Sequence, residues 1–281
     1  MGDPMRIGDS SNLSGVFQWN KTQQGLEKIH EKLATGKAIN HASDDAAMLA
    51  VMKEFDKQVR AFRNAGENIS AGLSALNISD SGSSAITDML QRQRDLALQA
   101  SNGTLNDDQR GAIDKEYQAL SQEIGRIAES TEFNGQKLLN GEGPLADGQG
   151  NIHVGSGAGT TDQIKLTASQ LTPESLGLIQ TSVMDAGSAE KALSKIDEAL
   201  KMVHANRAER GALHNRLEYS DSNNQTQLIQ TTQSLSQIED LDMAKGITEE
   251  VRQSILSQSN EAAISQFNQL SRTHLMALLQ G

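Results

Sequence analysis

Residues 48–76 read MLAVMKEFDKQVRAFRNAGENISAGLSAL, and this stretch decides the fold. Its mostly apolar positions recur at spacings of about four and three, at Met48, Val51 or Met52, Phe55, Val59, Phe62, Gly66, Ile69, Leu73 and Leu76. A repeat near 3.5 residues puts one apolar seam along a helix that packs lengthwise on other helices. The stretch therefore predicts a long helix in a bundle.

The ends of this helix are marked by polar residues. We expect it to run over about residues 44–100, a length of roughly 85 Å at 1.5 Å per residue. Ser43 or Asp44 is the predicted N-cap, and Asp44 and Asp45 suit the positive end of the helix dipole. Ser-Asn-Gly at 101–103 predicts the stop.

A second helix is expected to start at Asn106-Asp107-Asp108, whose side chains favour a helix N-terminus. Its apolar stripe consists of Ile113, Tyr117, Leu120, Ile124 and Ile127. The second half of the chain repeats this phase with Leu193, Ile196, Leu200, Val203, Leu217, Leu228, Leu235 and Ile238. Arg207, Arg210 and His214 interrupt that seam, which favours a bundle with several partners over a two-stranded coil.

Proline and glycine mark the middle of the chain as irregular. The prolines are Pro4, Pro144 and Pro173, so two long stretches are free to form helices. Glycines crowd between residues 141 and 159, and Ile-His-Val at 152–154 and Ile-Lys-Leu at 164–166 flank a turn region. We predict a mainly α fold, a long antiparallel helical bundle or coiled coil, with a small β-hairpin region around residues 133–170.

The two ends of the chain carry thin apolar stripes among Gln, Ser and Asn. The stripe residues are Val16, Trp19, Leu26, Ile29 and Leu33 near the N-terminus, and Ile247, Val251, Ile255, Ile264, Leu270, Leu275 and Leu278 near the C-terminus. A lone helix of this kind is marginal in water. Both ends therefore need partners, either each other or neighbouring copies, unless they are frayed helices folded onto a single domain.

The composition excludes several classes of partner. The net charge of −11 and the lack of Lys/Arg runs argue against nucleic acid and against an anionic membrane surface. The chain has no cysteine, which rules out disulfides and thiolate chemistry. No apolar run reaches the roughly 18 residues of a spanning helix, and no secretory h-region is visible at the N-terminus.

Motifs that suggest catalysis have simpler explanations. His30-Glu31 begins like a zinc-protease helix, but Ala34 stands where the second histidine belongs. Gly-Ser-Gly at 155–157 lies in a glycine-rich loop rather than in a nucleophile elbow. The acidic pairs Asp44-Asp45 and Glu249-Glu250 suit helix N-termini and solvated surface. We predict no catalytic residue, no cofactor site and no metal site, and a protein that is not an enzyme.

Five motifs in order along the chain resemble those of the bacterial flagellins. LATGKAINHASDDAAMLA (33–50) resembles L-S-S-G-x-R-I-N-x-A-x-D-D-A-A-G-L-A, and LQRQRDLALQ (90–99) resembles L-Q-R-x-R-E-L-x-x-Q. EFNGQKLL (132–139), GALHNRL (211–217) and IEDLDMA (238–244) are similar to three further signatures. Lys37, Ala38 and Met48 depart from the pattern, which affects details of filament packing rather than the family.

The resemblance implies a structural subunit of the flagellar filament that self-assembles through its terminal helices for swimming motility. Residues 1–42 and 240–281 are expected to form the inner coiled-coil domain lining the filament channel, and residues 43–239 the outer rod. The short middle implies that large outer domains are absent. An extracellular location reached by type III export is implied, as are an export chaperone, cap proteins and hook-junction proteins as partners.

A patch for an innate immune receptor is also implied by the resemblance. It maps onto Arg92, Leu96, Gln99 and Glu116, of which the first three share a helix face by their spacing. The same face suits packing between copies in the polymer. Two other functions remain open: a hook–filament junction protein, which shares the terminal helices, and a surface adhesin or receptor ligand. A hydrolase is a third class, for which the sequence offers no set of titratable groups.

Overall fold

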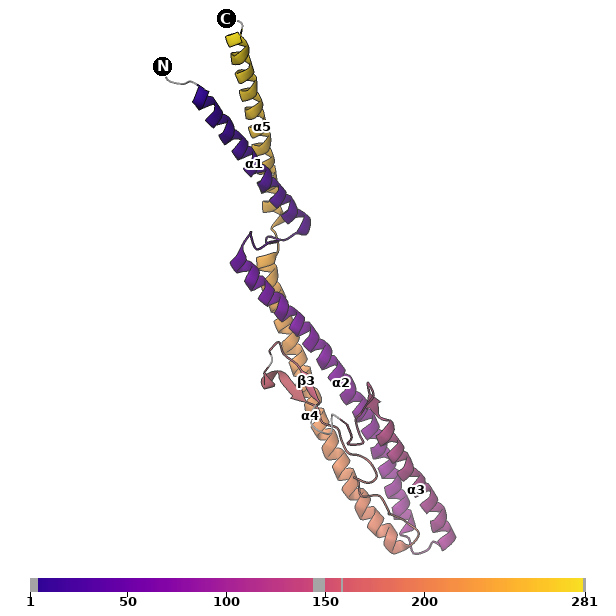
Figure 1. The fold of residues 1–281 in the computed structure, drawn as a ribbon. Coiled ribbons are helices and arrows are strands. Elements are labelled where there is room, and N and C mark those ends of the chain that lie inside the picture. The colour runs from indigo at the N-terminus through magenta and orange to yellow at the C-terminus, as the bar shows by residue number, and fades with distance from the viewer. Residues whose placement is uncertain (1–4, 144–149, 158, 280–281) are drawn as a thin grey trace. The chain divides into compact units, whose positions relative to one another are not determined.

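The computed structural model describes residues 5–143, 150–157 and 159–279, and of these all side chains except those of residues 5–12, 271, 274, 275 and 277–279. The elements are α1 (Met5–Thr35), α2 (Ala46–Ala100), α3 (Asp107–Ser130), β1 (Glu132–Phe133), β2 (Gln136–Lys137), β3 (Asn151–His153), η1 (Thr160–Asp162), β4 (Gln163–Lys165), α4 (Ala186–Glu239) and α5 (Met243–Leu279). The described residues confirm the mainly α fold with its hairpin region (Figure 1).

The chain divides into two compact units. One consists of Met1–Lys57 with Thr231–Gly281 and is called here the terminal unit, and the other is Gln58–Gln230, called here the bundle. In the bundle, α2 and α3 run beside the first part of α4 (Figure 1). The partition predicted from sequence, at residues 42/43 and 239/240, concerns position in an assembled filament and stays a prediction.

The helix ends follow local capping chemistry. The carboxylate of Asp45 accepts the N–H of Met48 at 2.9 Å, so Asp45 caps α2 and the predicted caps, Ser43 and Asp44, were wrong by one or two positions. At α3 the side chain of Asn106 accepts the N–H of Gln109, and the side chain of Gln109 accepts the N–H of Asn106. This reciprocal capping box confirms the predicted restart.

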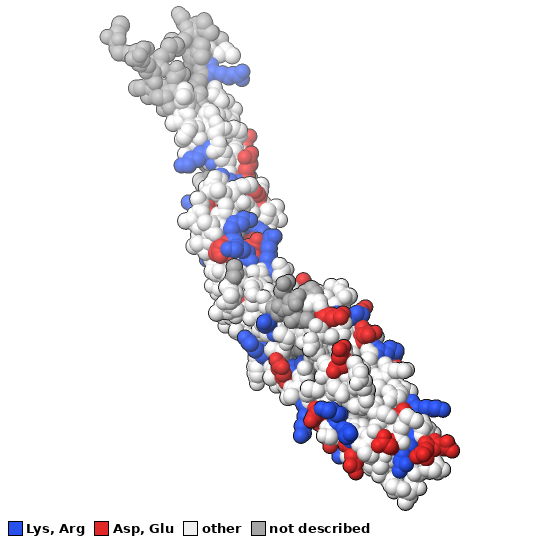
Figure 2. Space-filling view, turned by 60° about the horizontal axis from the view of Figure 1, so that its bottom comes forward, with Lys and Arg blue, Asp and Glu red and all other residues white. Residues whose placement is uncertain are grey.

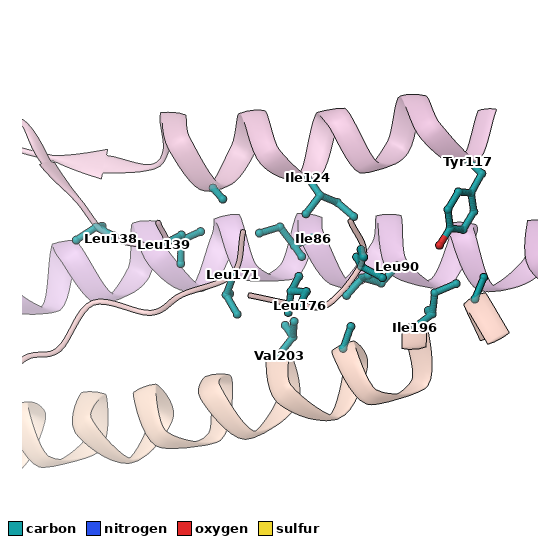
Figure 3. Packing of buried hydrophobic residues seen from close by; sticks show 14 of the residues in the cluster. Ile86, Leu90, Tyr117, Ile124, Leu138, Leu139, Leu171, Leu176, Ile196 and Val203 are labelled. Carbon is teal, nitrogen blue, oxygen red and sulfur yellow. The ribbon is translucent and has the colours of Figure 1, made fainter. Parts of the chain in front are cut away.

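The bundle is held by one apolar core. Ile86, Leu90 and Tyr117 are fully buried and lie between α2, α3, α4 and the segment 171–183 (Figure 3). The predicted seam is confirmed at Val59, Phe62, Ile69 and Leu76. Each fully buried aliphatic side chain contributes roughly 1.5–3 kcal/mol to folding, so this cluster is the main source of the bundle's stability.

The predicted seam is wrong at its start. Met48 and Val51 are both 43% exposed, whereas Met52 is buried. The structure therefore selects Met52 over Val51. At the start of α2, Met48 and Val51 are exposed to solvent.

Two short hairpins pack on α2 in the middle segment. In β1–β2, Phe133 pairs with Gln136 across Asn134 and Gly135, which both adopt positive φ. In β3–β4, Ile152 pairs with Ile164 in antiparallel register, which confirms the predicted hairpin. Gly72 of α2 receives this second hairpin, since a Cβ there would lie 2.4 Å from Cδ1 of Ile152.

Arg210 ties the middle segment to α4 from inside the protein. Its side chain is 6% exposed, and its guanidinium donates to the Ser169 hydroxyl, the Asn206 amide oxygen and the carbonyls of Leu138 and Thr167. Burial lowers the pKa of Arg210 to about 10. The residue that interrupts the apolar seam thus supplies donors to two loop carbonyls, of which that of Leu138 also accepts the N–H of Ser169.

Candidate assembly surface

α1 and α5 pack against each other in antiparallel fashion within the terminal unit. The amide of Gln23 donates to the hydroxyl of Ser257 at 2.8 Å, and His30 Nε2 lies 3.3 Å from Glu250 Oε1. The amide of Asn260 donates to Thr22 Oγ1 at 3.2 Å. These contacts show that the two ends of the chain are partners of each other, one of the two possibilities left open by the sequence.

The face between the two helices is only partly apolar. Among the predicted assembly residues, Ile29 is buried, and Trp19, Leu26 and Leu33 are half-buried. The buried polar residues Thr22 and Ser257 lie on the same face. A partly polar contact face leaves part of each apolar stripe outside it.

A pocket of about 260 Å³ remains where the two helices meet. It is lined by Val16 and Trp19 of α1 and by Glu261 and Ile264 of α5. The indole N–H of Trp19 is buried and has no acceptor among the described residues. The α1–α5 contact is therefore incompletely filled in the single chain.

The outward face of α5 carries an apolar stripe. Met243, Ile247, Val251 and Ile255 recur every four residues and are 48%, 52%, 48% and 61% exposed. Leu270, farther along α5, is 61% exposed. The predicted residues Leu275 and Leu278 lie outside the described side chains. Contiguous exposed apolar surface of this kind marks an interaction site in a soluble protein.

α1 exposes an apolar group that the sequence analysis did not select. Leu13 and Phe17 are 74% and 71% exposed, and Val16 beside them is 42% exposed. The spacing of four between Leu13 and Phe17 was the available signal, because such residues lie on one helix face. They join Val16 in the terminal surface, defined here as Leu13, Val16 and Phe17 with the α5 residues Ile247, Val251, Ile255 and Leu270.

The segments that precede α2 and α5 are bound to each other inside the terminal unit. Lys37 and Asp240 form an antiparallel bridge, in which Ala38 N donates to Glu239 O at 2.7 Å and Leu241 N to Gly36 O at 2.8 Å. Lys37 also pairs with the carboxylate of Glu239, and this hydrogen bond raises the pKa of Lys37.

A second turn precedes α2. The carboxylate of Asp44 accepts the N–H groups of His41 and Asn40, both at 3.1 Å. The bond from His41 is the largest influence that lowers the pKa of Asp44. Asp44, predicted as a cap, therefore orders the turn before the helix.

The predicted receptor residues do not all lie on the surface. Arg92 donates through Nε and Nη2 to Glu116 Oε1 at 2.9 and 2.7 Å, and both side chains are about half exposed, at 55% and 48%. Gln99 is exposed, whereas Leu96 is 2% exposed in the core. Arg92, Gln99 and Glu116 thus remain available to a partner in the single chain, and Leu96 supports them from below.

The residues whose motifs resemble catalytic ones lie on the surface. Ser156 is exposed in the loop after β3, and His30 is an exposed partner of Glu250. In the part of the chain that the structure describes, no three His, Asp or Glu side chains are grouped to hold a metal ion. Acidic and basic side chains are interspersed on the face of the bundle in Figure 2. None of the described helices is long and apolar enough to span a membrane.

These features define a helical protein with exposed apolar surfaces suited to assembly. Comparisons with known proteins identify its class. The model of the bacterial flagellin N-terminal helical region matches residues 12–143, and that of the bacterial flagellin C-terminal helical region matches residues 193–279. A flagellin from Halalkalibacterium halodurans is 35% identical over 90% of this chain and 91% of its own. The flagellar filament 33 kDa core protein of Treponema phagedenis is 31% identical over 95% of this chain and 98% of its own.

A solved structure shares the fold at low identity. It is described as a flagellar hook-associated protein from Vibrio parahaemolyticus, and it matches 70% of this chain and all of its own with a TM-score of 0.57 and 16% identity. That likeness shows the fold alone. The family models and the curated relatives show more: the chain belongs to the bacterial flagellin family, a family of structural proteins.

Proposed function

We propose that this chain is a structural subunit of the bacterial flagellar filament and assembles through the terminal surface. The observation that carries the proposal is the exposure of Ile247, Val251 and Ile255 on α5 and of Leu13 and Phe17 on α1. The membership of the chain in the flagellin family supports the filament as the product of this assembly.

Pairing of α1 with α5 does not satisfy these side chains. The buried residues between the helices are Ile29 and the polar Thr22 and Ser257, while Leu13 and Phe17 of α1 and the α5 stripe stay exposed. Burying one such side chain against another molecule yields roughly 1.5–3 kcal/mol. A surface of several such residues therefore favours association, against the cost of bringing two copies together.

The geometry of a filament follows from the use of different surfaces on each copy. When one surface of a subunit binds a different surface of the next, the contact repeats and gives a helical polymer unless its rotation closes into a ring. The exposed residues of α1 and of α5 are two such non-identical surfaces. We propose that they meet across neighbouring copies, which places residues 1–42 and 240–281 in the inner domain of the filament.

The direct test removes residues 251–281. The truncated protein is expected to keep the helical signal of the bundle by circular dichroism and to form no filaments by electron microscopy. Normal filaments from the truncated protein would refute assembly through α5. Long filaments from the full chain would also separate this role from that of a junction protein, which forms only a short zone.

A point variant makes the test more selective. Ile255→Asp places a charge in the terminal surface, and Gln233→Asp places the same charge at an exposed position of α4 outside that surface. Ile255→Asp is expected to abolish polymerisation and Gln233→Asp to reduce it far less, because only the first desolvates a carboxylate on burial. Equal loss in both would mean that charge, and not the apolar stripe, decides assembly.

The cellular setting follows as part of the same proposal. The subunit serves swimming motility outside the cell, is exported by a type III route, and meets an export chaperone, cap proteins and hook-junction proteins before it is incorporated. It acts as a building block and not as an enzyme. Detection of the chain in sheared extracellular filaments, and its absence from them when the export route is disabled, would test this setting.

Recognition by an innate immune receptor is a second proposal, supported by the exposed pair Arg92 and Glu116 and by exposed Gln99. Arginine at a contact is a frequent hot spot. Arg92→Ala is expected to weaken receptor activation by unpolymerised protein at least tenfold, with Arg126→Ala of the exposed Arg126–Glu123 pair on α3 as the matched control. Activation unchanged by Arg92→Ala would argue against this patch.

A further inference from the structure

We infer a second assembly contact within the bundle, in which Tyr219 of one copy enters a pocket on α2 and the hairpins of a neighbouring copy. The inference rests on the proposed filament role and extends it to a surface outside the terminal unit. It commits to a second copy of this chain as the occupant. The argument uses the pocket, the exposed tyrosine and the charge of both surfaces.

The pocket has a volume of about 360 Å³ and lies where the two hairpins pack on α2. Phe133, Ile152 and Leu166 give it apolar walls, and Asn68, Gln136 and Asn151 give it polar groups. A pocket of this size is large enough for one aromatic side chain and lies at the low end of the range of roughly 300–1,000 Å³ for ligand sites. The mixture suits a side chain with an apolar ring and a hydroxyl, which is the chemistry of tyrosine.

Tyr219 is an exposed side chain that fits such a pocket. It is 80% exposed on α4, although the chain holds only two tyrosines and few aromatic residues. Its neighbour Leu217 is buried and packs over Gly72, which lines the pocket. Because successive helix positions differ by about 100°, Tyr219 points to the side of α4 opposite Leu217. Tyrosine and pocket therefore occupy one level of the bundle on different faces.

The charges of the two surfaces permit contact between identical copies. A chain with a net charge of −11 repels its copies, so contacts form best where charge is absent. None of the residues that line the pocket is Asp, Glu, Lys or Arg. Glu218 and Asp221 flank Tyr219, but the pocket lining holds no carboxylate to repel them. Residues 222–230, which follow them, read SNNQTQLIQ and lack charge, and Ile229 among them is 57% exposed.

The arrangement is a knob on one face and a socket on another, at one level of the same unit. Such a contact is heterologous, so each copy uses both its knob and its socket and copies are linked side by side. It adds a contact between bundles to the contact made by the terminal helices. An aromatic anchor in a pocket is also the composition of an interface hot spot.

Cross-linking between two single variants tests the contact directly, since the chain has no cysteine of its own. Asn215→Cys places a thiol one turn from Tyr219, and Asn151→Cys places one at the pocket, and both side chains are exposed. The two variants are co-polymerised and treated with a short bismaleimide. We expect cross-linked dimers from this mixture and none when Ala112→Cys of α3 replaces Asn151→Cys.

Substitutions of the tyrosine give the second measurement. Tyr219→Ala is expected to raise the critical concentration for polymerisation at least tenfold, while Tyr219→Phe raises it by roughly threefold or less because the ring is kept. Unchanged polymerisation of Tyr219→Ala, equal loss in Tyr219→Phe, or filaments without the dimer would each overturn the contact. Failure of the unmodified chain to polymerise would instead overturn the proposed function.

Discussion

In the bundle, the fully buried side chains are mainly Ile, Leu and Ala, whereas the α1–α5 pair buries the polar Thr22 and Ser257 beside Ile29. The terminal unit exposes large apolar side chains instead, because α5 turns Val251 and Ile255 outward. The bundle thus buries most of its apolar residues within one chain, although Tyr219 and Ile229 stay exposed. The terminal unit leaves a larger share of its apolar residues exposed, so folding depends mainly on the bundle and assembly mainly on the terminal unit.

The largest effect is expected from a core truncation in the bundle. Leu90→Ala removes a fully buried side chain and should lower the free energy of unfolding by about 2–5 kcal/mol. Ile255→Ala on α5 should lower it by less than about 0.5 kcal/mol while still impairing polymerisation. Urea unfolding followed by circular dichroism measures both. Similar losses in the two variants would remove the distinction between the units.

Arg210 sharpens the comparison, since it is a charged residue that the bundle buries. Arg210→Ala removes one donor from each of the carbonyls of Leu138 and Thr167 and should cost about 1–3 kcal/mol. The pKa of Arg210 is lowered to about 10 by burial, so the unfolded chain keeps its proton to higher pH than the folded chain. The contribution of Arg210 to stability therefore rises as the pH passes above about 10.

The measurement for Arg210 compares the unmodified chain with Arg210→Met at pH 9 and pH 11. The difference in unfolding free energy should shift in favour of the unmodified chain at the higher pH. A difference that is independent of pH would show that the guanidinium is solvated in the folded protein.

A smaller effect is expected at the start of α3. Asn106→Ala removes one half of the capping box with Gln109 and should cost about 1 kcal/mol. Asn106→Asp should restore most of it, because a carboxylate also accepts the N–H and favours the helix N-terminus. Thermal unfolding of the three proteins checks this, and equal melting of Asn106→Ala and the unmodified chain would contradict it.

The smallest effect concerns the turn at Asp44 in the terminal unit. Hydrogen bonds from His41 and Asn40 lower the pKa of Asp44, so its contribution is present above the unfolded value of about 3.9 and is lost as the pH falls through the folded value. The protection factor of the His41 amide, which is the exchange rate of an unstructured peptide divided by that of this amide at the same pH, should therefore fall below about pH 4. Asp44→Asn should make this protection factor nearly independent of pH, and an unchanged acid response would assign it to another group.

The long helices could be predicted because apolar spacing and capping residues are local signals. The seam at Val59, Phe62 and Ile69 and the restart at Asn106 needed no knowledge of distant segments. The β3–β4 hairpin could also be predicted locally, from the apolar triplets at 152–154 and 164–166. The choice between Val51 and Met52 required the position of the partner helix, which periodicity alone leaves open.

Contacts from distant segments account for the rest. Arg210 looked like an interruption of the seam because its acceptors, Leu138 and Thr167, come from far away in the chain. Leu96 shares a spacing with exposed Arg92, yet it is buried once α3 and α4 surround α2. Leu13 and Phe17 were missed because the sequence does not show which face of α1 packs on α5 and which face stays exposed.

The two ends of the segment between residues 139 and 169 lie next to each other in the bundle. Ser169 N donates to Leu138 O at 3.0 Å and Leu171 N to Leu139 O at 2.8 Å, and Arg210 binds both sides. The ends of the intervening loop are thus fastened next to each other whatever lies between them. Since doubling a loop costs only about 0.6 kcal/mol in closure entropy, foreign peptides or whole domains grafted between these fastened ends would be displayed without unfolding their carrier.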